Sequence, residues 1–311
     1  MNGLEESVSA HRDPDADLSG ILHLEGPEEV WKEVAAICAL VAPAEDPARF
    51  EEVFSDTMAM YQGTFPGYQA CNTPYHDLSH TLDTLLAAAR LAHGLSDSGW
   101  PISPDGFFLA LTAALLHDTG YLQEQCDCEG TGARYAKIHV QRSADFAVRY
   151  LGSRGFGTED RERCRLMILC TDLAQNPCAL PFPDPETGVL GKTLAVADVL
   201  GQMASRLYLE KLLLLYREFR EGGVIEFASE LDLLEKTRGF FELVKRRMAR
   251  QCDALNLLMQ RHFRVRWKIP CDPYALYMEK NLAYLDQLLA NRENGYRNEL
   301  RRAGIVKNLQ D

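Results

Sequence analysis

The chain has 311 residues, of which 46% are hydrophobic and 25% are charged, which is enough for one large domain or two small ones. Its formal net charge of −12 argues against a nucleic-acid polymer as the main ligand, because phosphate backbones recruit basic surfaces. A small phosphorylated substrate stays open, since a bound metal ion can supply positive charge locally.

The cysteines and the N-terminal residues bear on location. Nine cysteines are scattered along the chain, and an odd, unpatterned set of this kind is not typical of a disulfide framework. The first 20 residues are acidic and lack an apolar segment, so they do not resemble a secretory signal. No apolar run approaches the ~20 residues that span a bilayer. We therefore expect a cytoplasmic protein with reduced cysteines and no membrane partner.

The N-terminal part divides into a tail and a helical segment. Residues 1–25 are rich in Asp, Ser and Gly and predict a flexible acidic tail. Residues 26–70 are predicted to hold N-terminal helices, over 27–41 and over 47–63 with Gly63 as the helix end. A loop rich in Gly, Pro and Asn then leads to Pro74.

The middle of the chain, residues 71–220, is the predicted core. The run that ends at His117 is apolar on nearly every side, which is typical of a buried central helix. Thr158 is a predicted helix cap, and Gly94 a predicted helix end. Helical periodicity covers residues 78–94, 104–117, 135–155, 158–173 and 191–219, with an irregular four-proline loop before the last of these.

The C-terminal part, residues 221–311, is predicted to pack further helices onto the core. Helical patterns extend over about residues 226–263 and 274–292. No segment alternates with a period of two, so no strand is predicted. The sequence therefore predicts an all-α, single-domain helical bundle.

The stretch YHDLSH at residues 75–80 places two histidines four residues apart. Positions i and i+4 of a helix share one face, so His76 and His80 face the same cavity if the helix begins near Pro74. A lone histidine on an apolar helix is more often a hydrogen-bonded core residue. The interpretation as a metal site therefore depends on its neighbours.

Those neighbours are acids placed in apolar surroundings. His117 and Asp118 follow the run LTAALL, and Asp198 lies within AVADVLGQ. Adjacent residues point about 100° apart on a helix, so the His-Asp pair can converge on one ion near a helix end, which Gly120 permits. Burying a carboxylate is costly unless it is paired or bound to a metal. Two acids with two or three histidines suit one or two divalent ions, with Mg, Mn, Zn, Fe or Ni as candidates.

Taken together, His80, the pair His117-Asp118, and Asp198 resemble the H…HD…D signature of the HD-domain metal-dependent phosphohydrolases. Tyr75-His76, with His80 four residues on, is similar to the YHN-x-x-H motif of class I cyclic-nucleotide phosphodiesterases. The likeness covers roughly residues 72–220. It implies an HD-type helical bundle in which these four residues are the metal ligands and Asp118 can bridge two ions.

The resemblance also implies a reaction. His76 matches the general acid that protonates the leaving oxygen, and Tyr75 matches a residue that shapes the motif's turn beside the substrate pocket. A metal-bound water has a lowered pKa and can attack phosphorus as hydroxide near neutral pH. The expected activity is hydrolysis of a phosphoester in a small phosphorylated substrate, with a nucleotide or cyclic nucleotide favoured. A homodimer is left open.

Some residues depart from the pattern of the phosphodiesterases. Tyr121 stands where they carry a further histidine, and Asp77 replaces their Asn, which puts the cyclic-nucleotide substrate in doubt. His139 is a candidate for a second metal or for the phosphate, against a structural hydrogen bond. Arg142, three residues on, is a candidate for the phosphate, against a surface salt bridge. Cys126 and Cys128 resemble half a zinc site, but no matching pair follows.

Two other functions remain as alternatives. A di-iron oxygenase occurs on the same fold, but that class uses two histidines between the HD pair and the last Asp, and this chain offers only His139 there. A nucleotide-binding sensor without turnover would normally have lost a metal ligand, and all four are present. The sequence therefore favours the hydrolase.

Overall fold

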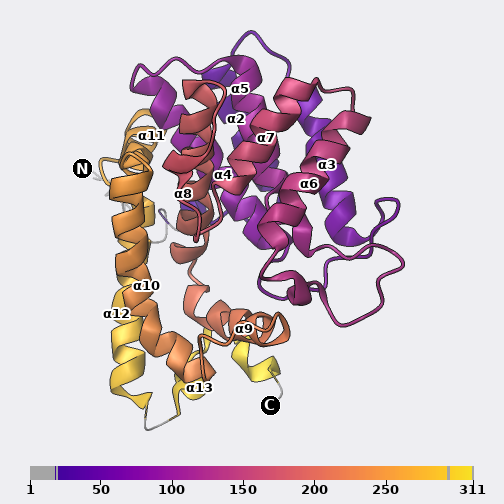
Figure 1. Ribbon diagram of the computed structural model, residues 1–311. Helices are drawn as coiled ribbons and strands as arrows, with labels where there is room; N and C mark the ends of the chain where they lie inside the picture. Colours follow the sequence, from indigo (N-terminus) through magenta and orange to yellow (C-terminus); the bar gives the residue numbers. More distant parts are fainter. Residues whose placement is uncertain (1–17, 19, 293–294, 310–311) are drawn as a thin grey trace, which may run out of the picture.

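Helices and the loops that join them make up nearly all of the computed structural model, which describes residue 18, residues 20–292 and residues 295–309 (Figure 1). Within these residues the β pairing is limited to one isolated bridge between Tyr68 and Glu124. The predicted all-α, single-domain class is confirmed. None of the helices in this part of the chain is long and apolar enough to cross a membrane.

Seven helices between residues 26 and 203 of the described chain form the upper bundle in Figure 1. They are α2 Gly26–Val41, α3 Ala48–Gln62, α4 Leu78–Asp97, α5 Pro104–Leu116, α6 His139–Ser153, α7 Thr158–Leu169 and α8 Pro185–Met203. Short 3-10 turns lie between them, at Thr119–Tyr121, Gly132–Tyr135 and Pro177–Ala179.

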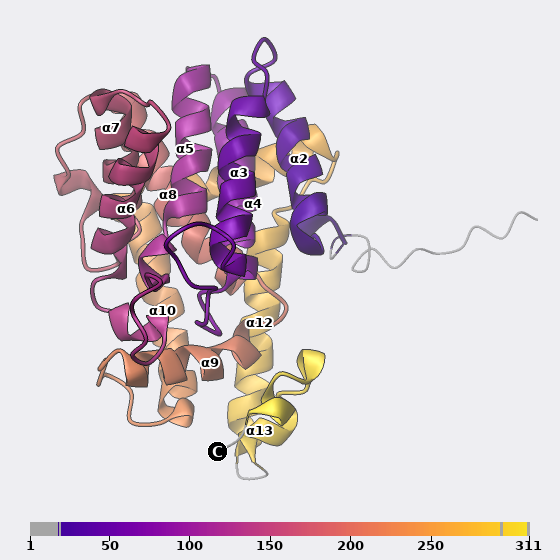
Figure 2. The same ribbon diagram turned by 90° about the vertical axis from the view of Figure 1, so that its right-hand side faces the viewer.

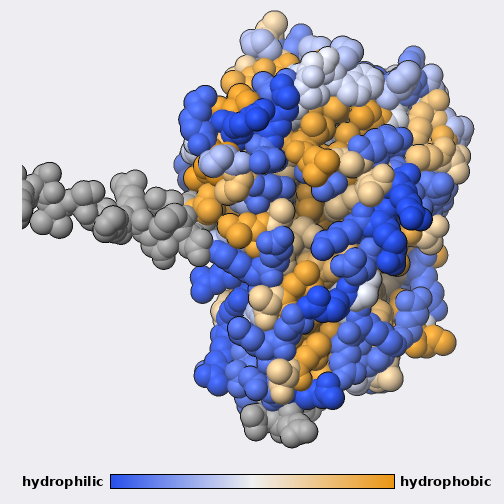
Figure 3. All heavy atoms as spheres, turned by 90° about the vertical axis from the view of Figure 1, so that its left-hand side faces the viewer, coloured by the Kyte–Doolittle hydropathy of each residue, from blue (hydrophilic) through white to orange (hydrophobic). Residues whose placement is uncertain are grey.

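The described helices after residue 207 lie along the left side and the lower end of the molecule in Figure 1. They are α9 Tyr208–Glu221, α10 Glu230–Gln251, α11 Leu258–Arg266, α12 Pro273–Ala290 and α13 Tyr296–Glu299, with 3-10 turns at Leu255–Leu257, Arg302–Gly304 and Val306–Asn308. Helices α10 and α12 run side by side and contact α8 and α9. The outer face that they form with α11 is a mosaic of hydrophilic and apolar side chains (Figure 3).

Helix α4 is the centre of the bundle and packs against α2, α5, α8 and α11. It begins because the Asp77 carboxylate accepts a hydrogen bond from the His80 backbone N–H at 2.9 Å. The prediction that Gly94 ends this helix is wrong, because α4 continues to Asp97. A Cβ on Gly94 would lie 2.2 Å from the Leu258 carbonyl oxygen, so this glycine lets α11 approach α4 closely.

Helix α5 delivers the His-Asp pair. Its first turn is capped by Ser103, whose hydroxyl accepts a hydrogen bond from Gly106 N–H at 3.0 Å. The helix is buried over most of its length and ends at Leu116, so that His117 is its C-cap and Asp118 begins a 3-10 turn. The predicted helix end beside the pair is confirmed.

The prediction of one continuous helix over residues 191–219 is wrong. Helix α8 ends at Met203, and a separate helix, α9, begins at Tyr208. The break is stabilised from α12, where the Asn281 side-chain amide donates hydrogen bonds to the carbonyls of Met203 and Ser205 at 3.0 and 2.8 Å. As a result α9 crosses the lower end of the bundle, as Figure 2 shows from a second side.

Three smaller expectations also need correction. The residue at the α7 cap position is Gly157, without a side-chain cap, and the Thr158 hydroxyl accepts a hydrogen bond from Arg161 instead. The pattern over residues 226–263 is divided between α10 and α11. Most of the predicted flexible tail lies outside the described residues. Its last part is held in place, because the backbone carbonyls of Ile21 and Leu22 accept hydrogen bonds from the buried guanidinium of Arg90.

Candidate metal centre

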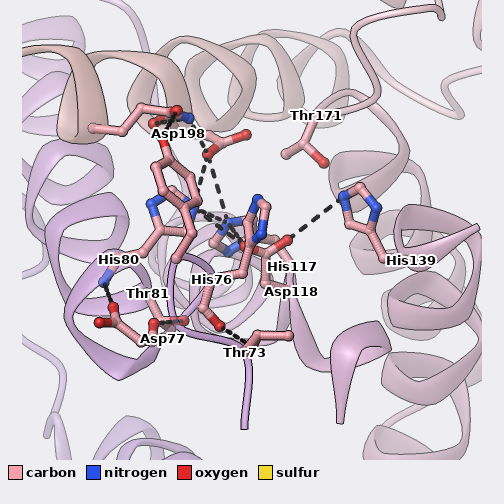
Figure 4. Close-up of polar contacts among 12 residues, drawn as sticks. Thr73, His76, Asp77, His80, Thr81, His117, Asp118, His139, Thr171 and Asp198 are labelled. Atoms are coloured by element: carbon pink, nitrogen blue, oxygen red, sulfur yellow. Dashed lines mark hydrogen bonds and ion pairs between the residues drawn. The ribbon is translucent and has the colours of Figure 1, made fainter. Parts of the chain in front are cut away.

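The four predicted ligands converge from three parts of the bundle (Figure 4). His80 lies in the first turn of α4, His117 and Asp118 follow α5, and Asp198 lies in α8. The Nε2 atom of His80 is 3.2 Å from Oδ2 of Asp118 and 3.2 Å from Oδ1 of Asp198. The Nε2 atom of His117 is 3.3 Å from Oδ2 of Asp118, 3.7 Å from Oδ1 of Asp198, and 3.3 Å from Nε2 of His80.

The donor atoms are buried but not satisfied by one another. The side chains of His80, His117 and Asp118 are at most 4% exposed, and that of Asp198 is 15% exposed. Oδ2 of Asp118 is fully buried and makes no hydrogen bond of good geometry, although two imidazole nitrogens lie beside it. A buried carboxylate is costly unless protonated imidazoles or a bound cation compensate its charge.

The spacing of the donors also fits an ion. Ligand atoms about 2.1 Å from a common cation lie about 3 Å from each other in octahedral geometry and slightly further apart in tetrahedral geometry. The contacts of 3.2 and 3.3 Å among His80, His117 and Asp118 match this spacing, and Asp198 lies 3.2 and 3.7 Å from the two histidines. The buried group His80, His117 and Asp118 can therefore hold a metal ion.

Backbone hydrogen bonds set which imidazole nitrogen faces the centre. Nδ1 of His117 donates to the carbonyl of Ala114 at 2.8 Å, and Nδ1 of His139 donates to the carbonyl of Ala136 at 2.7 Å. In the neutral rings, both Nε2 atoms are then left with a free lone pair, as metal ligation requires. Nε2 of His139 lies 3.8 Å from Oδ1 of Asp118, the second oxygen of that carboxylate.

Without a cation, the imidazoles carry the positive charge that the two carboxylates demand. Burial lowers the pKa of His80, but Asp118 and Asp198 overcome this and raise it to about 9. Burial acts on His117 in the same way, and the same carboxylates hold its pKa well above 6.5. Burial raises the pKa of Asp118, but the imidazoles of His117, His80 and His76 together outweigh burial and hold it well below its usual range. By contrast, burial lowers the pKa of His139.

His76 reaches the centre by a different route from the predicted one. The helix begins at Leu78, so His76 and His80 do not share a helix face. Instead, Nδ1 of His76 lies 2.5 Å from Oε2 of Glu218, a buried residue of α9. Oε1 of Glu218 accepts a hydrogen bond from the backbone N–H of Tyr75 at 2.6 Å. This carboxylate fixes the bend before α4 and leaves Nε2 of His76 free.

Tyr121 lies between two histidines of the site. Its ring stacks on His76 with centroids 4.3 Å apart and on His139 with centroids 4.4 Å apart. Burial raises the pKa of the Tyr121 phenol well above its usual value. Tyr121 therefore acts as a neutral spacer, which holds the planes of both imidazoles.

Tyr75 is connected to the metal centre through Gln202. The Tyr75 hydroxyl lies 2.5 Å from Oε1 of Gln202, and the Gln202 amide lies 3.4 Å from Oδ1 of Asp198. Gln202 therefore orients the carboxylate that faces the ion site. Its place one helical turn after Asp198 was a sequence signal that our prediction missed. Glu218 had no comparable local signal, because it is 142 residues from His76 in the chain.

A cavity of about 400 Å³ opens from the centre. Tyr75, His76 and His139 line it together with metal-centre residues, so the predicted catalytic and pocket residues meet in one space. Arg142, a candidate for the phosphate against a surface salt bridge, does not contribute to this lining. Its Nε donates to the Gly120 carbonyl at 2.8 Å, and its guanidinium stacks on Tyr135 at 3.5 Å. Arg142 therefore ties the 3-10 turn after Asp118 to α6.

His93, His262, Cys126 and Cys128 do not line this cavity. His93 and His262, for which the sequence offered no partner, face each other with 3.1 Å between their Nδ1 atoms. Cys126 and Cys128 are exposed, and the described residues place no histidine or acid with them in a potential metal site.

The chain was compared with known proteins at the level of family, sequence and fold. No protein family, no curated protein and no solved structure matches it significantly. The function must therefore be argued from the site itself.

Proposed function

We propose that this protein is a metal-dependent phosphohydrolase with an HD-type bundle, which cleaves a phosphoester in a small, nucleotide-like substrate. One observation carries the proposal. Oδ2 of Asp118 is buried 3.2 and 3.3 Å from the Nε2 atoms of His80 and His117, so these three donors can hold one cation, and a cavity large enough for a small substrate opens at this point. The proposed ligand set is completed by Asp198, in the order given by the H…HD…D pattern.

The roles of the chain's own residues follow from their contacts. A divalent cation held by the four ligands would activate a water and offset charge on the phosphate oxygens. His76 carries its Nδ1 proton toward Glu218 and presents Nε2 to the cavity, where it can donate a proton to the leaving oxygen. Asp118 faces His139 with its second oxygen, so a second ion would bind between these two residues.

Hydrolysis of bis-p-nitrophenyl phosphate by protein loaded with Mn²⁺ tests the proposal, together with metal analysis. We expect Asp118→Ala to lose both bound metal and turnover, because it removes the carboxylate shared by the ligands. Asp145→Ala is the matched control, since it removes an exposed acid of α6 and should keep both. If the protein binds metal but hydrolyses no phosphoester, the proposed phosphohydrolase activity is wrong. Bound iron with an O2-dependent spectrum would indicate an oxygenase instead.

The general acid has its own test. His76→Ala should keep its metal and lose about 10²-fold or more in rate with poor leaving groups such as alkoxides. The loss should be small with p-nitrophenolate, which leaves without a proton. Equal losses for both leaving groups would show that His76 serves another purpose.

A further inference from the structure

The cavity continues beyond the metal centre into a space that we call the chamber. Its wall comes from α9, α10 and the turn between them. The apolar side chains of this wall are Leu212, Leu215, Phe219, Phe227, Leu233 and Phe240. The chamber and the metal centre are parts of one cavity, so one bound molecule can reach both.

Several of these apolar side chains remain partly exposed. Leu215, Phe219, Phe227 and Phe240 are only half-buried, although they face a concave space. Phe219 and Phe227 stack with centroids 5.6 Å apart and planes at 9°, which presents a flat aromatic wall. Covering such surface with an apolar group is favourable by roughly 25 cal/mol per Å².

Several polar side chains that line the cavity are already hydrogen-bonded within the protein. The hydroxyl of Thr237 donates to the Leu233 carbonyl at 2.8 Å, and the hydroxyl of Thr171 donates to the Ile168 carbonyl at 2.8 Å. Gln202 is bound to Tyr75 and Asp198. The wall therefore favours a group that needs burial rather than one that must be read by hydrogen bonds.

The charges of the chamber disfavour a second anionic group. Among the described residues that line the cavity, Lys236 is the only lysine or arginine. Its Nζ is held by Oδ2 of Asp232 at 2.8 Å and by the Glu226 carbonyl at 2.9 Å. The carboxylates of Asp172 and Glu226 also line the cavity. A second phosphate in the chamber would meet acids and no free cation.

We infer that the substrate carries a single phosphate, bound at the metal centre, and a compact, uncharged apolar group that fills the chamber. This inference rests on the proposed function and narrows it. Phosphoesters of a flat or branched apolar group belong to this class. Substrates with two separated phosphates, such as dinucleotides or nucleoside polyphosphates, do not.

The test measures binding without turnover, using non-hydrolysable phosphonates and Mn²⁺-loaded protein in a calorimeter. We expect 2-naphthylmethylphosphonate to bind on the order of 10-fold or more tighter than methylphosphonate, because the rings are buried against the chamber wall. The same naphthyl compound with a carboxylate on the far edge of the ring should lose this gain. Equal affinities of the three compounds would overturn the inference.

Two variants locate the effect. Leu215→Trp fills the chamber and should abolish the naphthyl gain while leaving methylphosphonate binding unchanged. Leu243→Trp is the matched control, because Leu243 is an exposed leucine of α10 outside the cavity lining, and it should keep the gain. A gain that survives Leu215→Trp would place the apolar group elsewhere. Should the wild-type protein hydrolyse no phosphoester, the proposed function falls, and the affinity ratio still decides the nature of the chamber.

Discussion

Asp118 faces two groups of imidazoles, with Oδ2 toward His80 and His117 and Oδ1 toward His139. Its position at a helix end lets one carboxylate address both sides. The charge balance differs between these sides, because His80 and His117 have raised pKa values whereas burial lowers the pKa of His139. A cation that binds between Asp118, His80 and His117 must therefore displace the protons of these two imidazoles.

This balance predicts proton release when the site is loaded. At pH 7 the imidazoles of His80 and His117 are protonated, since the pKa of His80 is about 9 and that of His117 is also raised. Binding of Mn²⁺ should release about two protons per ion. Calorimetry in two buffers of different ionisation enthalpy measures this number. His139→Ala should leave it unchanged, and binding without proton release would contradict the assignment of these ligands.

Glu218 positions the proposed general acid. A glutamine there would offer an amide N–H to Nδ1 of His76 in place of the carboxylate, so the doubly protonated ring that donates from Nε2 would lose its counter-ion. We expect Glu218→Gln to keep bound metal and to lose about 10²-fold in rate with poor leaving groups. Glu210→Gln is the matched control, because it removes another fully buried carboxylate of α9 that lies outside the cavity lining. Similar losses in both variants would mean that only the packing of α9 matters.

At the scale of elements, the site depends on how closely α6 approaches the turn after α5. Gly120 has no room for a side chain, because a Cβ there would lie 2.0 Å from the His139 carbonyl oxygen and 2.8 Å from the Ser143 nitrogen. The Gly120 N–H donates to the Ser143 hydroxyl at 2.8 Å. This contact sets the distance between Asp118 and His139.

Gly120→Ala should therefore push α6 away and destabilise the protein by about 1–3 kcal/mol, as overpacking does. Urea unfolding gives the free energy of unfolding for comparison. Gly239→Ala is the control, since nothing lies within 4 Å of a Cβ at that exposed position of α10. Gly239→Ala should stabilise the folded protein by about 0.5–1 kcal/mol, because alanine lowers the backbone entropy of the unfolded chain. A neutral Gly120→Ala would show that α6 can shift freely.

At the scale of the whole molecule, the buried pair His93 and His262 joins α11 to α4. Burial, with help from Arg90, lowers the pKa of His262 to about 2, and burial also lowers the pKa of His93. The folded state therefore keeps His262 neutral, whereas the unfolded chain binds a proton below its ordinary pKa of 6.5. The resulting stability is present above pH 6.5 and is lost as the pH falls.

His262 alone should account for about 2 kcal/mol of lost stability between pH 7 and pH 5. Urea unfolding at several pH values measures this slope. We expect His262→Asn to be less stable at pH 7 but to lose less stability on acidification. An unchanged slope in this variant would mean that protonation of other groups dominates acid unfolding.

The sequence by itself determined the local features. Helical periodicity and caps placed α2, α3 and α5 within a few residues, because these signals depend on near neighbours. The candidate metal ligands were proposed for a similar reason, since His80, the pair His117-Asp118 and Asp198 are polar residues within or directly after apolar helical stretches, and such exceptions are visible without a structure.

Only the tertiary structure decided the rest. Asn281 breaks the helix predicted over residues 191–219, and Glu218 holds His76 from a helix that lies far away in the chain. The pairing of His93 with His262 and the chamber likewise arise where distant helices meet. Hydrogen bonds and packing between remote segments leave no periodic trace in the sequence, because each partner alone resembles an ordinary residue of its own helix.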